Sequence, residues 1–435
     1  MLITACETRL AVAGGAPIIK SPLRSYKSIG TEECEAVNEV MRSGELSGFI
    51  GAWCDEFYGG KKVQEFEELW SARFDCAHTI SVNSNTSGLI AALGAIGTGP
   101  GDEIIVPPFT MSATAIAPLF YGAIPVFVDL EADYFCLDVE KVEAAITDKT
   151  KAILAVDLFG HPAELHRLKA LTERRGLFLI EDAAQAPLAT ERGRYAGTIG
   201  DIGVFSLNYH KHIHTGEGGM CCTNDDELAF RLRAIRNHGE NIVETLNVKN
   251  ITNLIGFNFR MTELNAAIGI EQLKKIDQLV ERRVEKAEKL IRRINKLPFI
   301  DVPPTRSGCK HVYYVLPILF ENEKCNLSRA KVAAALSAEG VPISEGYVSP
   351  LYTLPLFQRR IAIGREGWPF SSSGRTYPKG LCPIAENLSY ETLLDFCVCA
   401  FELDDEELEL VSLAFEKVFS NLEQLQNLQS SSASV

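Results

Sequence analysis

The chain has 435 residues, more than one hydrophobic core usually holds, so we expect a large domain and a smaller one. Its 43 Lys and Arg residues against 57 Asp and Glu residues give a formal net charge of -14 at pH 7. Because this charge repels phosphate backbones and anionic membrane surfaces, we expect small-molecule partners and neither nucleic acid nor membrane.

The cysteines and the start of the chain bear on the cellular compartment. The sequence has twelve cysteines without paired CxxC spacing, which predicts neither a zinc site nor a disulfide scaffold and fits reduced thiols. The first 20 residues lack a basic stretch followed by a long apolar core, so no signal peptide or membrane span is predicted. We therefore expect a cytoplasmic protein.

Residues 1–30 are predicted to form an N-terminal arm, and residues 31–275 a large domain. From Thr79 onward, short β-branched runs alternate with helical stretches. The predicted strands are 79–82, 103–106, 124–128, 151–156, 177–181, 202–207 and 219–224, and the predicted helices are 113–121, 162–175, 226–239 and one that opens at Thr86. This alternation is typical of an α/β domain with a mostly parallel, seven-stranded sheet flanked by helices, which binds ligands at the carboxyl ends of its strands.

Residues 276–425 are predicted to form a smaller C-terminal α+β domain that includes a connecting helix. The periodicity of 262–297 predicts one or two helices between the domains. Beyond them we expect a strand at 311–320 and helices at 328–340, 390–401 and 404–422. Residues 426–435 are Ser-rich and predict a disordered tail.

Polar residues follow three of the predicted strands. Asp182 comes directly after an apolar run, where its carboxylate could keep a ligand nitrogen protonated, and Gln185 could hydrogen-bond a ring hydroxyl. The alternative is that Asp182 only caps a helix. Residues 83–88 (NSNTSG) open a helix, whose free N–H groups and the hydroxyls of Thr86 and Ser87 could bind an anion, with ordinary N-capping as the alternative.

Lys211 lies in a Gly-rich loop after the predicted strand 202–207. Burial beside a cofactor would shift this lysine toward its neutral, nucleophilic form, and Ser206 could donate to a phosphate. A solvated loop lysine is the alternative, although the glycines of 216–219 indicate a tightly turned backbone. A lysine, an acid and an anion site are what pyridoxal phosphate (PLP) requires, together with a flat or apolar cover for its ring.

Three histidines, His210, His212 and His214, alternate around Lys211. On a strand they would present three imidazoles on one face, as in a metal site. No Asp, Glu or Cys partner stands at a fixed spacing, so we expect no metal, and polar packing around Lys211 is the alternative.

Several motifs in one order resemble the DegT/StrS family of PLP-dependent aminotransferases, which have the aspartate aminotransferase fold (fold type I). They include GDEIIVPPFTMSATA, IEDAAQA, GDIGVFSLNYHKHIHTGEGGM and GFNFRMTELNAAIG, and the resemblance covers about residues 10–421. It implies that Lys211 is catalytic and carries PLP as a Schiff base, that Asp182 binds the pyridine nitrogen, and that Gln185 binds the ring hydroxyl.

The resemblance also implies phosphate contacts from Thr86, Ser87 and Ser206. Asn258, in GFNFR, matches a residue that reaches the phosphate from a neighbouring subunit, which implies a homodimer with a shared active site. The family's ring-stacking position, often aromatic, aligns with Met111, so either Met111 or Phe109 covers the ring.

By resemblance, the chain is expected to transfer an amino group from glutamate or glutamine to the keto group of a nucleotide-linked sugar, with ping-pong kinetics, in polysaccharide or antibiotic biosynthesis. A keto-cyclitol is the alternative acceptor, because LCPIAENL at 381–388 resembles the cyclitol and aminobenzoate branches. A PLP-dependent sugar dehydratase, in which a histidine replaces the lysine, is disfavoured by Lys211. A non-enzymatic PLP-binding protein is a further alternative.

Overall fold

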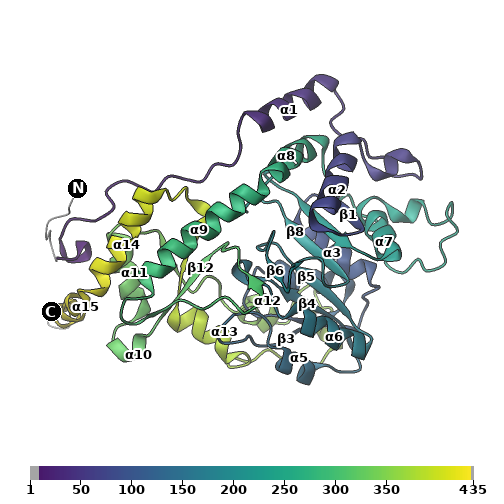
Figure 1. Ribbon diagram of the computed structural model, residues 1–435. Helices are drawn as coiled ribbons and strands as arrows, with labels where there is room; N and C mark the ends of the chain where they lie inside the picture. Colours follow the sequence, from purple (N-terminus) through teal and green to yellow (C-terminus); the bar gives the residue numbers. More distant parts are fainter. Residues whose placement is uncertain (1–8, 433–435) are drawn as a thin grey trace.

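A computed structural model describes residues 9–432, with side chains described as far as residue 427. Its larger sheet has seven strands in the order β1-β9-β8-β5-β4-β2-β3 (Figure 1). The strands are β1 (His78–Val82), β9 (Gly219–Thr223), β8 (Ile202–Ser206), β5 (Phe178–Asp182), β4 (Thr150–Val156), β2 (Glu103–Val106) and β3 (Ile124–Phe127). β9 runs antiparallel to β1 and β8, whereas the other neighbours are parallel, which confirms the predicted mostly parallel α/β sheet.

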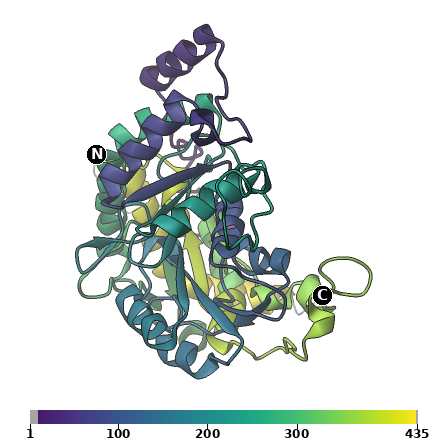
Figure 2. The ribbon, with the colours of Figure 1, turned by 90° about the vertical axis from the view of Figure 1, so that its right-hand side faces the viewer.

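Helices cover this sheet, and its central strands are buried along nearly their whole length. All four residues of β2 are buried, as are six of the seven in β4. Apolar runs without polar alternation are what a parallel sheet covered on both faces requires. The helices of this part are α1 (Thr31–Ser43), α2 (Lys61–Phe74), α3 (Asn85–Ala95), α4 (Ala113–Ile116), α5 (Val139–Ala145), α6 (Leu165–Arg175) and α7 (Asp226–Arg236). Figure 2 shows α1 projecting at the top of the molecule.

A second sheet of four antiparallel strands has the order β10-β12-β14-β13. Its strands are β10 (Ile300–Asp301), β12 (Leu316–Phe320), β14 (Leu393–Phe396) and β13 (Ile343–Glu345). The predicted helix at 390–401 is wrong, because β14 is a buried strand between β12 and β13. A short apolar run such as LLDF does not distinguish a buried strand from a buried helix, and only its pairing partners decide.

Two helices in succession connect the sheets: α8 (Glu263–Lys274) and α9 (Ile276–Ile294). α9 buries Val280, Ala287, Leu290 and Ile294, which recur at helical spacing on one face. The helices that follow are α10 (Asn322–Cys325), α11 (Arg329–Ala338), α12 (Pro355–Gln358), α13 (Pro383–Asn387), α14 (Asp405–Phe419) and α15 (Leu422–Ser432). Figure 1 shows α9 running from α8 toward α11 and α14.

Short elements complete the chain. The 3-10 turns are η1 (Ala11–Ala13), η2 (Asp55–Tyr58), η3 (Ala117–Tyr121), η4 (Leu158–Gly160), η5 (Gly239–Asn241), η6 (Leu351–Thr353), η7 (Phe370–Ser372) and η9 (Val398–Ala400), and η8 (Leu388–Thr392) is a π turn. A three-stranded sheet joins β11 (Cys309–Lys310), β6 (Thr190–Glu191) and β7 (Arg194–Tyr195).

The segment from η6 to α13 crosses back to the large sheet, although the sequence assigns it to the smaller domain. The Leu351 amide donates to the Pro108 carbonyl at 2.7 Å, and the Tyr377 hydroxyl donates to the Pro125 carbonyl at 3.0 Å. Buried residues of this segment belong to the same apolar core as the seven-stranded sheet. The part of the chain beyond the large domain in sequence therefore helps to build that domain.

The two ends of the described chain pack near the smaller sheet. Leu10, Ile19 and Leu23 of the predicted arm lie in its apolar core, together with residues of α11 and α14. α15 continues to Ser432, whereas a disordered tail is predicted from 426; residues 433–435 lie outside the described part. Among residues 9–432, no helix is long and apolar enough to cross a membrane.

Candidate active site

The residues predicted from the sequence meet at one edge of the seven-stranded sheet. β1, β5 and β8 run in the same direction, so their carboxyl ends, and the loops after them, lie together. A cavity of about 240 Å³ lies at this edge. Its walls are Ser84, Asn85, Thr86, Thr110, Met111, Ala113, Asp182, Ala184, Gln185, Ser206, Asn208, His210, Lys211, Glu217, Gly218, Tyr314 and Tyr347.

Asp182, the last residue of β5, is buried at the wall of the cavity. One carboxylate oxygen accepts from Asn85 Nδ2 and from the Ala184 amide, both at 3.2 Å, and the other accepts from Thr114 Oγ1 at 3.2 Å. Burial raises the pKa of Asp182, while these donors and the nearby Lys211 oppose the rise. The helix-cap alternative is wrong, because β5 is followed by turns and then by β6, and the bond to Ala184 lies in the first of these turns. The side-chain donors fix the carboxylate at the cavity wall.

Lys211 lies in the loop after β8 and is 8% exposed. Burial lowers the pKa of its amine to about 8, although Asp182 acts in the opposite direction. A buried amine near neutrality is available as a nucleophile and as a base. The solvated loop lysine, the alternative from the sequence, does not fit this burial.

Gln185 connects the cavity to both sheets. Its Oε1 accepts from the Phe159 amide at 2.7 Å, and its Nε2 donates to the Tyr347 hydroxyl at 3.0 Å. Tyr347 follows β13, and its amide donates to Asp395 of β14 at 3.0 Å. The amide and the phenol therefore present polar atoms at a wall that both sheets build.

The start of α3 forms another part of the wall. Ser84 caps the helix, because its Oγ accepts from the Ser87 amide at 3.1 Å. The amides of Asn85 and Thr86 are first-turn amides, which have no acceptor inside a helix. Thr86 lines the cavity, and Ser206 lines it from the end of β8, so an anion could bind here.

Three predicted residues do not line this cavity. Ser87 directs its hydroxyl to Asn83 Oδ1 at 2.6 Å and so takes part in the helix cap. Asn258 is exposed, and its carbonyl accepts from Asn83 Nδ2 at 3.5 Å. Phe109 is fully buried, with its ring 6.0 Å from that of Tyr347, whereas Met111 is 62% exposed at the cavity wall.

The three histidines around Lys211 face different partners. His210 Nδ1 lies 3.3 Å from the Tyr314 hydroxyl, His212 Nε2 lies 2.8 Å from the Val312 carbonyl, and His214 Nδ1 accepts from the Gly216 amide at 3.3 Å. They lie in a loop and not on a strand. Within residues 9–432, no three His, Cys, Asp or Glu side chains are grouped to hold a metal ion.

Several residues that contribute to the site were not predicted from the sequence. Asn85, Tyr314 and Tyr347 line the cavity, and Thr114 donates to Asp182 although it does not line the cavity itself. Asn85 stands within the NSNTSG segment, so its polar neighbours were a signal that could have found it. Tyr314 and Tyr347 lie more than a hundred residues after Lys211 in the sequence, and nothing in their local pattern indicates a site. Only the packing of the smaller sheet against the larger one brings them here.

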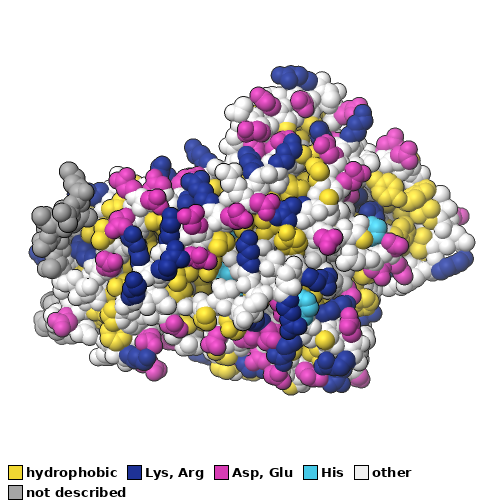
Figure 3. Space-filling model, in the orientation of Figure 1, with side chains coloured by type: hydrophobic (Ala, Val, Ile, Leu, Met, Phe, Trp, Pro, Cys, Tyr) yellow, Lys and Arg dark blue, Asp and Glu magenta, His cyan; other side chains and the backbone are white. Residues whose placement is uncertain are grey.

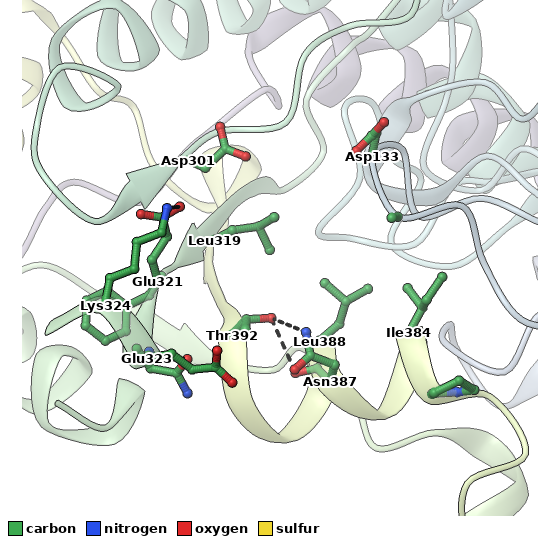
Figure 4. A pocket seen from close by; sticks show the side chains of 14 residues that line it. Asp133, Asp301, Leu319, Glu321, Glu323, Lys324, Ile384, Asn387, Leu388 and Thr392 are labelled. Atoms are coloured by element: carbon green, nitrogen blue, oxygen red, sulfur yellow. Dashed lines mark hydrogen bonds and ion pairs between the residues drawn. The ribbon is translucent and has the colours of Figure 1, made fainter. Parts of the chain in front are cut away.

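A larger cavity, of about 610 Å³, lies elsewhere between the two parts of the molecule (Figure 4). Asp133 lies on one side of it, and Asp301, Glu321 and Glu323 lie on the other. Its single basic side chain, Lys324, is paired with Glu321 at 2.6 Å. None of the residues predicted from the sequence to act on a ligand lines it.

A buried lysine and a buried carboxylate at the carboxyl edge of a mostly parallel sheet are the groups that a PLP-dependent enzyme needs. A family model of the DegT/DnrJ/EryC1/StrS aminotransferases matches residues 27–392. The chain belongs to this family of PLP-dependent aminotransferases, which confirms the resemblance seen in the sequence.

Relatives and solved structures agree with this assignment. The chain is 33% identical to L-glutamine:2-deoxy-scyllo-inosose aminotransferase of Streptoalloteichus tenebrarius, over 94% of this chain and 97% of that protein. It is 37% identical to GDP-perosamine synthase of Caulobacter vibrioides, over 68% of this chain and 78% of that protein. The crystal structure of DesI in the presence of its TDP-sugar product matches with a TM-score of 0.80 and 25% identity, over 97% of this chain and 99% of that one.

Proposed function

We propose that this enzyme transfers an amino group from glutamate or glutamine to the ring ketone of a nucleotide-linked sugar, through Lys211. The observation that carries the proposal is the single cavity that holds the Lys211 amine, the buried Asp182 carboxylate and the start of α3. This donor set fits PLP, because it offers an amine for the aldehyde, an acid for the ring nitrogen and N–H groups for the phosphate.

PLP, when bound, supplies an aldehyde that condenses with amines and a ring that accepts electrons from the substrate carbon. Asp182 would keep a proton on the ring nitrogen, held in place by Asn85 and Thr114. Thr86 and Ser206 would bind the phosphate, Gln185 the ring hydroxyl, and Met111 would cover the ring. These roles are supported by the positions of the side chains at the cavity wall.

Lys211 would have two tasks. Its amine would hold the cofactor between turnovers. Once released, the amine would move a proton from the carbon of the amino donor to the cofactor carbon, and in the other half-reaction from the cofactor carbon to the carbon of the acceptor. An amine with a pKa of about 8 exists in both forms near neutral pH, which suits this exchange. Because the keto-acid product leaves before the acceptor binds, ping-pong kinetics are expected.

The nucleotide-linked acceptor is supported by two of the similar proteins, GDP-perosamine synthase and the DesI structure with a TDP-sugar product. A keto-cyclitol is the second candidate. It is favoured by the inosose aminotransferase, whose similarity extends over nearly the whole of both chains and whose name specifies L-glutamine as donor. Lys211 disfavours the dehydratase alternative, in which a histidine occupies this position.

We also propose that the active site is shared across a homodimer. Asn258 is exposed and does not line the cavity of its own chain, so its side chain is free to serve another subunit. Exposed apolar side chains lie in the segment between α1 and α2, including Ile50 and Trp53, and in the loop between η5 and α8, including Ile251 and Ile255. Figure 3 shows a hydrophobic patch at the right-hand end of the molecule, where Figure 1 places α7. Light scattering that gave the mass of one chain would contradict this proposal.

The test of function uses the PLP-loaded enzyme and L-glutamate or L-glutamine, followed by a panel of keto-sugar nucleotides and keto-cyclitols. Mass spectrometry of the products separates amino transfer from loss of water. We expect an aminated sugar nucleotide; an aminated cyclitol alone would favour the second candidate, and a dehydrated product or no turnover with any acceptor would contradict amino transfer.

Lys211→Ala should reduce turnover by about a thousandfold or more, because both the attachment point and the base are lost. It should also remove the visible absorbance of the lysine-bound cofactor. Lys149→Ala, which changes an exposed lysine before β4, is the control and should leave both unchanged. Retention of turnover and absorbance by Lys211→Ala would exclude this role.

A further inference from the structure

The Lys211 amine has an unusual environment for a buried cation. Within the described residues, its Nζ makes neither a hydrogen bond nor an ion pair, although Asp182 lies close enough to act on its charge. The contact that Nζ does make is with the ring of Tyr314, whose centroid is 4.1 Å away. An aromatic face attracts a cation, and it does so most strongly where water is excluded.

The ring of Tyr314 is fixed from two sides. Its backbone amide donates to the Phe159 carbonyl at 2.8 Å, which ties the residue to the large sheet. Its hydroxyl lies 3.3 Å from Nδ1 of His210, the residue directly before Lys211. Tyr314 is 5% exposed, so its ring has little freedom to turn.

The hydrogen bond between Tyr314 and His210 involves two neutral groups. Burial raises the pKa of the Tyr314 phenol far above its usual range, and burial together with the Lys211 charge lowers the pKa of His210. Neither side chain therefore adds a charge beside Lys211 at neutral pH. What they add is an oriented aromatic face.

We propose that Tyr314 is a positioning residue for Lys211: its ring face holds the Lys211 ammonium in place, and the hydrogen bond from Tyr314 to His210 fixes that ring. Lys211 must alternate between a neutral and a charged amine if it moves a proton during amino transfer. Because Tyr314 precedes β12 of the smaller sheet, it is this sheet that stabilises the charged form of a lysine carried by the larger one.

Other groups also face Lys211 and have to be kept constant in a test. Asp182 on β5 favours the charged amine, as do Cys397, directly before η9, and Cys399, within it, when they are ionised. Glu217 lines the same cavity. Burial raises the pKa of both cysteine thiols, so these remain neutral over most of the pH range needed.

The test measures the pKa of Lys211 in the full-length protein after bound PLP has been removed, because a lysine joined to the cofactor offers no free amine to label. Trace acetic anhydride labels only neutral amines, and mass spectrometry of the Lys211 peptide at each pH gives the titration curve. The wild-type midpoint is expected near pH 8. Tyr314→Leu removes the attraction to the ammonium and should lower this midpoint by about half to one and a half pH units.

Two further variants test the fixing of the ring. Tyr314→Phe keeps the ring but loses the hydroxyl, and His210→Ala loses the other partner, so each should lower the midpoint by less than Tyr314→Leu does. The double variant, Tyr314→Phe with His210→Ala, should lower the midpoint no further than either single variant, because both substitutions remove the same hydrogen bond. Tyr209→Phe is the matched control: Tyr209 is in the same loop and 70% exposed, and its loss of a hydroxyl should leave the midpoint unchanged.

An unchanged or raised midpoint in folded Tyr314→Leu would overturn the proposal, and so would an equal shift in Tyr209→Phe or additive shifts in the double variant. Circular dichroism checks that each variant folds, and if Tyr314→Leu does not, the Phe and His210 variants decide. The absorbance of the PLP-loaded enzyme against pH provides a second curve that should move in the same order. The catalytic use of this contact rests on the proposed function. The labelling result does not, because the pKa of Lys211 can be measured whether or not any acceptor is aminated.

Discussion

The two faces of β5 put neighbouring carboxylates to different uses. Glu181 and Asp182 are adjacent, both are buried, and because side chains alternate along a strand they point to opposite faces of the sheet. Glu181 accepts hydrogen bonds from three backbone amides, those of Gly197, Ile199 and Gly200. Asp182 accepts from two side chains and one amide and also lines the cavity.

Burial of a carboxylate therefore does not by itself indicate that it acts on a ligand. The partners of Glu181 are the amides of one turn, and no cavity residue is among them, so this carboxylate stabilises the turn that leads into β8. The partners of Asp182 belong to α3, α4 and the loop after β5, and they orient it toward a space where a ligand can bind. Substitutions on the two faces should therefore affect different properties.

The largest expected effect is on activity, from Asp182→Asn. The amide cannot hold a proton on the ring nitrogen, and turnover should fall by roughly a hundredfold or more. The fold should be kept, because the amide oxygen still accepts from Asn85 and Ala184. Steady-state kinetics and the thermal midpoint measure both properties; a variant that unfolds, or that keeps full turnover, would place Asp182 with Glu181 as a structural carboxylate.

Glu181→Gln should produce the opposite result. Its NH₂ group cannot accept from the Gly197 amide, so a buried donor is left without a partner, which costs about 1 to 3 kcal/mol of stability. Turnover per folded molecule should stay within about twofold of wild type, since Glu181 does not line the cavity. Urea unfolding followed by fluorescence gives the loss of stability. A large loss of turnover without a loss of stability would contradict the structural role of Glu181.

The smallest effect is expected from Thr114→Val, which has nearly the same shape but donates nothing to Asp182. Loss of one hydrogen bond to a buried carboxylate should weaken PLP binding by about tenfold. Thr98→Val is the matched control, because the buried Thr98 hydroxyl makes no hydrogen bond among the described residues. Fluorescence titration of each protein with PLP measures the affinity, and equal affinities for the two variants would remove Thr114 from the site.

Much of the site could be predicted from the sequence because its residues follow strands. Asp182, Thr86, Ser206 and Lys211 each come within a few residues of the end of a strand, and the carboxyl ends of parallel strands share one edge. The same reasoning placed Ser87 in the site, where the structure uses its hydroxyl to cap α3. A short polar motif does not reveal which of two adjacent hydroxyls faces the ligand.

The sequence alone determined the family, the alternation that builds the seven-stranded sheet, and the local order of lysine, acid and helix start, because these depend on short stretches of chain. Three features depend on long-range packing: the strand within 390–401, the return of the segment from η6 to α13 to the large sheet, and the presence of Tyr314 and Tyr347 at the cavity wall. The reason is that these depend on which distant surfaces bury one another. No local pattern records such a choice.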